Sequence, residues 1–334
     1  MAPVSDAFDD GIGIPIKSLY GKTLNSLCPA KEDIAELDAL VVDLTDIGSR
    51  YYTYAQTLAY AMTVAGENDV KVLVLDRPNP IGGNQIEGSP LSNSNRSFCG
   101  IGPIANRHGL TIGELAFLFR DGFGDGDAAI EKHPCELEVV PVTAWNRSMY
   151  LDDTDIPWLP PSPNMMHLET AIVYPGACLF EATNISEGRG TVRPFQTIGA
   201  PFIDSEQWIA ATENTGIPLE GASLQAIEFT PRFQKHAGTL CRGVQIHIHE
   251  RLVFKPYRFG IALMAGAAKA FPNDFKWCEE PYEFIADIPA IDLLYGDSSL
   301  RQAIEGDFSI ETVFNQMEDF ESWFDSARTP YLRY

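Results

Sequence analysis

Two short apolar segments on either side of a helix-like segment restrict the fold of this chain more than any other feature. Residues 39–44 read ALVVDL, and residues 71–76 read KVLVLD. The segment between them, residues 53–67 (TYAQTLAYAMTVAGE), is rich in alanine and leucine, which favour a helix. A strand, a helix and a second strand within about 40 residues form a βαβ unit, whose strands lie parallel. The sequence therefore predicts a parallel sheet.

Later segments extend this pattern. We predict a helix over residues 110–122 that begins with a capping box formed by Thr111 and Glu114, and a third strand over residues 135–142. The segment AIVYPG (171–176) is predicted to be a short buried strand that ends in a turn. The remaining predicted elements are helices near 204–213, 257–271 and 309–325 and a strand at 244–250. The first part of the chain, to about residue 145, is thus predicted to be α/β and doubly wound.

Composition and charge exclude several classes of function. The chain has 334 residues and a formal net charge of −22, so a nucleic acid or an anionic membrane is not an expected partner. No apolar run is long enough to cross a bilayer, so membrane insertion is not expected either. No G-x-G-x-x-G follows a strand and no C-x-x-C pair is present, so we expect neither a cofactor nor a metal.

Polar side chains gather where the predicted strands end. In an open parallel sheet, ligands bind beyond the carboxyl ends of the strands. We therefore predict a cleft for a polar ligand, whose candidate residues are Asp43, Asp46, Arg50, Tyr52, Asp76, Arg77, Asn79, Glu87, Arg107, His108, Asn164, Asn184, Glu187 and Arg189. An alternative interpretation stays open at this point, in which the aspartates cap turns and Glu187 pairs with Arg189 inside one loop.

The types of residue in this set indicate a reaction class. Two carboxyl groups on either side of a bond are what glycoside hydrolysis requires. The chain has no G-x-S-x-G motif around a nucleophilic serine. The arginines point to a sugar that carries a negative charge.

Several motifs carry a resemblance to a known family. SLYG (18–21), DRPNP (76–80), NRHGLTIGELA (106–116) and SEGRGT (186–191) resemble the NamZ-type exo-β-N-acetylmuramidases, a family long catalogued as a domain of unknown function. The resemblance runs from Ile16 to Tyr334. It implies a Rossmann-like domain over residues 1–148 and a smaller α+β domain over residues 149–334, with a cleft between them. It also implies the release of terminal β-N-acetylmuramic acid from the non-reducing end of peptidoglycan fragments, without a metal or a nucleotide.

The sequence departs from the family at its start. Members of the family usually carry a Pro-Glu-His-Gly motif upstream of SLYG, which this chain lacks, so we expect its first domain to be shortened at the N-terminus. That motif supplies a glutamate and a histidine as further candidate catalytic groups. Residues 1–21 have no signal-peptide pattern, and the localisation and the oligomeric state stay open.

Together the residues and the resemblance predict a glycosidase. Its alternatives are a binding-only relative and a different hydrolase of small anionic substrates. We expect Glu87 or Glu187 to act in bond cleavage, with Glu87 as the better candidate for the acid and with Asp46 and Asp76 in reserve. Arg189 and Arg107, followed by Arg77 and Arg50, are the candidates to bind the lactyl carboxylate of muramic acid. The other predicted substrate-binding residues are Tyr52, Asn79, His108, Asn164 and Asn184.

Overall fold

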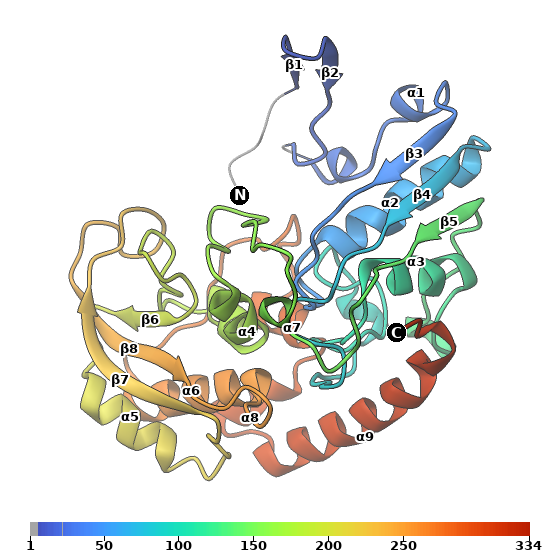
Figure 1. Ribbon diagram of the computed structural model, residues 1–334. Coiled ribbons are helices and arrows are strands. Elements are labelled where there is room, and N and C mark those ends of the chain that lie inside the picture. The colour runs from blue at the N-terminus through green and yellow to red at the C-terminus, as the bar shows by residue number, and fades with distance from the viewer. Residues whose placement is uncertain (1–5, 22) are drawn as a thin grey trace.

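A computed structural model describes residues 6–21 and 23–334, and its first part contains the predicted parallel sheet (Figure 1). The strand order is β3 (Ala39–Val42), β4 (Lys71–Leu75) and β5 (Leu137–Val140), and both neighbouring pairs are parallel. Helices α2 (Tyr54–Glu67) and α3 (Ile112–Asp121) pack on one face, where Val72 and Val74 are fully buried. The predicted strand–helix–strand unit and the third strand are confirmed.

The opposite face of this sheet is only partly covered. Val41 and Val140, whose side chains point to that face, are 54% and 42% exposed as whole residues. Parallel sheets are usually buried on both faces, because helices cover each side. The apolar residues of β3 and β5 therefore leave an accessible apolar surface on this side.

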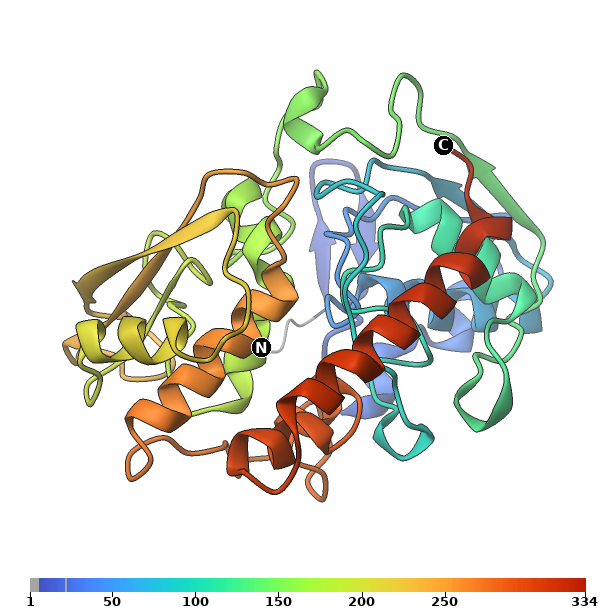
Figure 2. The same ribbon diagram turned by 90° about the horizontal axis from the view of Figure 1, so that it is seen from below.

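The second part of the described chain is built on an antiparallel sheet. Its strand order is β6 (Thr197–Ala200), β8 (Cys241–Ile248) and β7 (Ala222–Phe229). Helices α5 (Ser205–Glu213) and α6 (Pro256–Ala270) pack beside it, and α4 (Leu168–Ala177) packs on α6 (Figures 1 and 2). A Cβ atom at Gly176 would lie 1.8 Å from the carbonyl oxygen of Pro256, so α4 and α6 approach this closely only because a glycine stands there.

The predicted strand at 171–176 is wrong, because these residues form most of α4. All of them are buried, so the segment shows no helical alternation of apolar and polar residues. A proline is unfavourable inside a helix, so Pro175 also favoured the prediction of a strand. In the structure Pro175 lies in the last turn of α4, which passes directly into a 3₁₀ segment at Cys178–Ala182. Other elements that the sequence patterns did not predict are β6, β7 and several short ones: β1 (Ala7–Asp9), β2 (Ile14–Ile16), α1 (Lys31–Ile34), α7 (Ala290–Tyr295) and α8 (Ser299–Glu305).

The last long helix joins the two parts of the molecule. Helix α9 (Ile310–Arg328) confirms the helix predicted over 309–325 and runs along both parts in Figure 2. Val313 and Met317 pack in the core of the second part, whereas Phe320 and Phe324 pack in the core under the parallel sheet. The end of the chain therefore contributes to the first core, although the predicted boundary assigns residues 149–334 to the second domain.

Candidate active site

A cavity of about 170 Å³ lies where loops from the two parts of the chain meet. The first part contributes residues around the start of α2, and the second part contributes the loops after α4 and α6. Of the predicted site residues, this cavity brings together Tyr52, Asn164 and Arg189. Its other lining residues include Tyr20, Tyr51, Tyr54, Phe98, Met165, Tyr174, Glu181, Phe195, Tyr282, Glu283 and Phe284.

Arg189 organises the charged side of the cavity. Its Nε lies 2.9 Å from Oε1 of Glu187, and its Nη2 donates a hydrogen bond to Oε1 of Glu181. The other oxygen of Glu181 accepts a hydrogen bond of 2.8 Å from the hydroxyl of Tyr282. The other oxygen of Glu187 lies 3.1 Å from Nζ of Lys235. Glu181 lines the cavity, whereas Glu187 lies behind Arg189 and holds it in place.

Two carboxyl groups of this cavity differ in how readily they release a proton. Burial alone would raise the pKa of Glu181, but the charge and hydrogen bond of Arg189 and the hydrogen bond of Tyr282 lower it overall. The pKa of Glu283 is raised by burial first and by the neighbouring Glu181 carboxylate second. A pair of carboxyl groups whose environments move their pKa values apart is a typical acid and base arrangement. Of the two, Glu283 is the carboxyl group whose pKa is raised, so it keeps its proton to a higher pH than Glu181.

Glu283 reaches the cavity from a strained turn. The backbones of Tyr282 and Ile285 exchange two hydrogen bonds of 2.9 Å, and the two residues between them have φ angles of +46° (Glu283) and +70° (Phe284). Positive φ at both central positions is the geometry of a type I′ turn, which asparagine and glycine favour. Holding a glutamate and a phenylalanine in this conformation is unfavourable, and such strain gathers at functional sites. The sequence contains no turn signal for this segment, so Glu283 was not among the predicted site residues.

Glu87, the predicted acid, does not line this cavity. Glu87 is completely buried away from the cavity, and its Oε2 accepts hydrogen bonds from the backbone N–H groups of Tyr257 (3.1 Å) and Arg258 (3.3 Å). These N–H groups belong to the first turn of α6, so Glu87 caps that helix from another part of the chain. Burial raises the pKa of Glu87 to about 7, against the lowering effect of Arg107 and Arg258.

Arg50 is buried, does not line the cavity and bonds to the backbone of several loops. Its two terminal nitrogens donate hydrogen bonds to four backbone carbonyl oxygens, those of Ser89, Ile104, Leu294 and Tyr295. The distances lie between 2.7 and 3.1 Å, and the residue is 2% exposed. Arg50 therefore joins loops of the first part to the end of α7.

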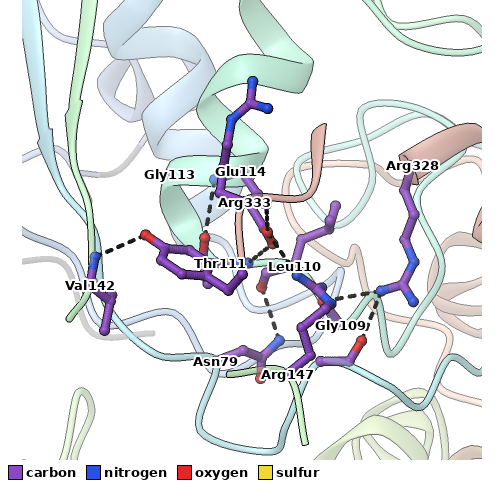
Figure 3. A network of polar contacts seen from close by, with 12 residues as sticks. Asn79, Gly109, Leu110, Thr111, Gly113, Glu114, Val142, Arg147, Arg328 and Arg333 are labelled. Carbon is purple, nitrogen blue, oxygen red and sulfur yellow. Dashed lines mark hydrogen bonds and ion pairs between the residues drawn. The ribbon is translucent and has the colours of Figure 1, made fainter. Parts of the chain in front are cut away.

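Asp76 holds the start of α3 instead of lining the cavity. Its Oδ1 accepts a hydrogen bond of 2.7 Å from the backbone of Gly113, and its Oδ2 accepts from the hydroxyls of Thr111 and Tyr334. Figure 3 shows this network around the predicted capping box, which Thr111 and Glu114 form. Burial raises the pKa of Asp76, although these hydrogen bonds act to lower it. These contacts place Asp76 at the start of α3, and it does not line the cavity.

Two predicted asparagines and Arg107 make similar structural contacts. Asn79 donates to the carbonyl oxygen of Leu110, which Figure 3 also shows, and Asn184 donates to that of Asp274. Arg107 is 1% exposed and donates to the carbonyl oxygen of Ile81 over 2.7 Å. None of these three residues lines the cavity.

Asp46 and His108 form a buried pair outside the cavity. Oδ2 of Asp46 lies 3.3 Å from Nε2 of His108, and Nδ1 of His108 accepts a hydrogen bond from the backbone of Leu110. Because Nδ1 accepts, the hydrogen of the neutral imidazole is on Nε2, toward Asp46. Asp46 and Arg77 line a small separate recess, and Arg77 pairs with the exposed Asp43.

Comparison with known proteins identifies the family. Residues 1–169 match the model described as "Exo-beta-N-acetylmuramidase NamZ, N-terminal", and residues 172–334 match the corresponding C-terminal model. The chain belongs to the NamZ family. The peptidoglycan β-N-acetylmuramidase NamZ of Bacillus subtilis (strain 168) is 42% identical over 332 residues, which are 99% of this chain and 75% of that protein. The resemblance predicted from the motifs is confirmed.

Two solved structures share the fold. Both are DUF1343 family proteins of Bacteroides fragilis, and this chain aligns with each over 98% of its own length and 82% of theirs. One is 29% identical with a TM-score of 0.86, and the other is 27% identical with a TM-score of 0.69. The chain therefore shares its mixed α/β fold, built on a three-stranded parallel and a three-stranded antiparallel sheet, with these proteins.

Residues 6–21 and 23–334 lack two other kinds of feature. Within these ranges, no three His, Cys, Asp or Glu side chains come together in a way that would hold a metal ion. None of the helices there has the length and apolar character that a membrane span requires.

Proposed function

We propose that this chain is an exo-β-N-acetylmuramidase, which removes terminal β-linked N-acetylmuramic acid from peptidoglycan fragments in cell-wall turnover. The observation that carries the proposal is the 42% identity to the B. subtilis peptidoglycan β-N-acetylmuramidase along 99% of the chain. The cavity agrees with it, because it combines carboxyl groups, an arginine and aromatic side chains. These are the groups that a site for an acidic sugar requires.

We assign the acid of the reaction to Glu283 and the ionised carboxylate to Glu181. The proton of Glu283 passes to the glycosidic oxygen as the bond from that oxygen to C1 of the sugar breaks. Water then supplies a hydroxyl group to C1, and its remaining proton returns to the Glu283 carboxylate. Glu181, which Arg189 and Tyr282 hold in place, stabilises the positive charge that develops on the sugar ring.

Arg189 and Tyr52 are our candidates for substrate binding. Nε and Nη2 of Arg189 contact Glu187 and Glu181, which leaves Nη1 without a hydrogen bond to any of the described residues. This nitrogen is available for the lactyl carboxylate, the group that distinguishes muramic acid from glucosamine. The hydroxyl of Tyr52 is buried in the cavity wall and has no partner among the same residues, so it is available to a sugar hydroxyl.

A chromogenic β-N-acetylmuramide tests the function directly. We expect release of the chromophore from this substrate and not from the matching β-N-acetylglucosaminide, which lacks the lactyl group. The Glu283→Gln variant, in which the proposed acid cannot release a proton, is the control for contaminating enzymes. Binding of N-acetylmuramic acid without turnover would show a binding protein instead, and cleavage of the glucosaminide at the same rate would contradict the proposed specificity.

A further inference from the structure

A second cavity adjoins the proposed active site. Its volume is about 400 Å³, and it shares two lining residues, Phe98 and Phe284, with the first cavity. The two cavities are therefore neighbours, and both of the residues that border them in common are aromatic. The second cavity is also lined by Leu24, Tyr60, Arg96, Ser97, Ile101, Ile130, Glu131, His133 and Ile285.

The second cavity has an aromatic wall. The ring of Tyr60, which α2 carries, stacks on the ring of Phe98 with centroids 5.8 Å apart and planes inclined by 28°. Phe98 is 2% exposed and Tyr60 is half-buried, and both rings line the cavity. A rigid aromatic surface of this kind suits the apolar face of a sugar ring.

Polar groups surround this aromatic wall. Nη1 of Arg96 donates to the carbonyl oxygen of Ala129, and no carboxylate of the described residues lies within 4.0 Å of this guanidinium. His133 shares a 2.6 Å hydrogen bond with the hydroxyl of Thr63, and burial lowers its pKa, so its imidazole is neutral at pH 7. Arg96 and His133 can therefore form hydrogen bonds with the hydroxyl and acetamido groups of a sugar.

The strained turn stands at the border between the cavities. Glu283 lines only the first cavity, whereas the next residue, Phe284, lines both. If the released sugar occupies the first cavity, a second sugar that is linked to it enters the second cavity past Phe284. The bond between the two sugars then lies beside Glu283, which is where an acid must stand to protonate the leaving oxygen.

We propose that the second cavity is the subsite for the uncharged amino sugar that is linked to the terminal muramic acid, with Tyr60 as its stacking surface. This inference rests on the proposed function and adds the location of the leaving group. It also explains why the unfavourable backbone at Glu283 and Phe284 is retained. The turn places Glu283 in the first cavity and Phe284 at the border between the two cavities.

Two substrates that differ only beyond the scissile bond test this subsite. The first is the disaccharide of N-acetylmuramic acid β-linked to N-acetylglucosamine, and the second is methyl β-N-acetylmuramide, which has nothing to place in the second cavity. We expect Tyr60→Leu to lower kcat/KM for the disaccharide about tenfold, mainly through KM, and to leave the methyl glycoside within about twofold. Leucine retains apolar packing on Phe98 and removes the aromatic face together with the phenolic hydroxyl.

Phe117→Leu is the matched control, because Phe117 is also a half-buried aromatic residue within a helix and lines neither cavity. It should leave the ratio of the two kcat/KM values as in the unmodified chain. The proposal is overturned if Tyr60→Leu leaves this ratio unchanged, or if it lowers kcat/KM equally for both substrates. If the unmodified chain hydrolyses neither substrate, the proposed function itself fails, and this is a different outcome from turnover with an unchanged ratio.

Discussion

Arg189 and Glu187 form an ion pair at the base of the cavity, with Nε of Arg189 2.9 Å from Oε1 of Glu187. The side chain of Glu187 is only 3% exposed, and that of Arg189 is 21% exposed. Lys235 approaches the other oxygen of Glu187 and also donates to the backbone carbonyl of Phe180. Glu187 therefore fixes the arginine that we propose as the ligand of the lactyl carboxylate, without lining the cavity itself.

Replacing Glu187 by glutamine should weaken substrate binding more than catalysis. The neutral amide would leave Arg189 and Lys235 partly uncompensated, so we expect KM for the muramide to rise more than kcat falls and the free energy of unfolding to fall by about 2 kcal/mol. Steady-state kinetics and urea denaturation measure the two effects. Glu228→Gln, which breaks an exposed pair with Arg242, is the control and should cost less than about 1 kcal/mol. Equal losses in the two variants would contradict the role of Glu187.

Replacing Glu283 by glutamine should abolish most of the turnover. Removal of the proposed acid is expected to lower kcat about 10²- to 10⁴-fold. Because the pKa of Glu283 is raised, the unmodified chain should keep its activity to a higher pH than an ordinary glutamic acid would allow, and lose it as the pH rises further. A profile of kcat/KM against pH measures this loss of activity at high pH. The Glu283→Gln variant should not show it. Glu280→Gln, at an exposed position nearby, is the control, and a similar profile for both variants would exclude Glu283 as the acid.

Replacing Glu87 by glutamine should change how stability depends on pH. The pKa of Glu87 is about 7 in the folded chain, and we take the ordinary value of 4.5 for the unfolded chain. Between these two pH values, Glu87 is ionised in the unfolded chain and protonated in the folded chain. The stability contributed by Glu87 is therefore complete below pH 4.5 and falls by about 3 kcal/mol as the pH rises through 7. Glutamine has no proton to lose and still accepts the N–H groups of α6.

Urea denaturation of both proteins at pH 4.5, 6 and 8 measures this difference. The unfolding free energy of the unmodified chain should decline relative to that of Glu87→Gln as the pH rises. Parallel curves would contradict the assignment. Hydrolysis of the chromogenic muramide should be retained by the variant, because Glu87 lies outside the cavity. Loss of turnover in a folded Glu87→Gln protein would return Glu87 to the mechanism.

Replacing Arg50 by alanine should destabilise the chain strongly. The change would leave four buried carbonyl oxygens without their hydrogen-bond donor, so we expect a loss of more than about 4 kcal/mol. Thermal unfolding followed by circular dichroism measures the effect. Arg50→Lys, which keeps the charge and some donors, should lose less, and Arg120→Ala, whose partner Asp121 is exposed, should change stability little. A small effect of Arg50→Ala would show that these contacts contribute little.

The sequence predicted the elements whose signals are local. Residues 39–44 and 71–76 are apolar runs of strand length, and the intervening helix has its own favourable composition, so β3, α2 and β4 were all predicted correctly. The capping box of α3 depends on two residues three positions apart, and it was found for the same reason. The prediction failed at α4, because a segment buried on all sides has no alternation that distinguishes a helix from a strand.

The family was evident from the sequence alone, because short motifs such as SEGRGT carry it and need no knowledge of the fold. The pairing of Arg189 with Glu187, two residues apart, was also open to prediction. Only the tertiary structure decided which polar residues meet in one cavity. Glu181 and Glu283 are about 100 residues apart in the chain, and they line one cavity because α4, the 3₁₀ segment after it and the turn at 282–285 pack together. Burial separated Arg50 and Glu87 from that cavity, because backbone carbonyl and N–H groups inside a folded chain must find partners and these two charged side chains supply them.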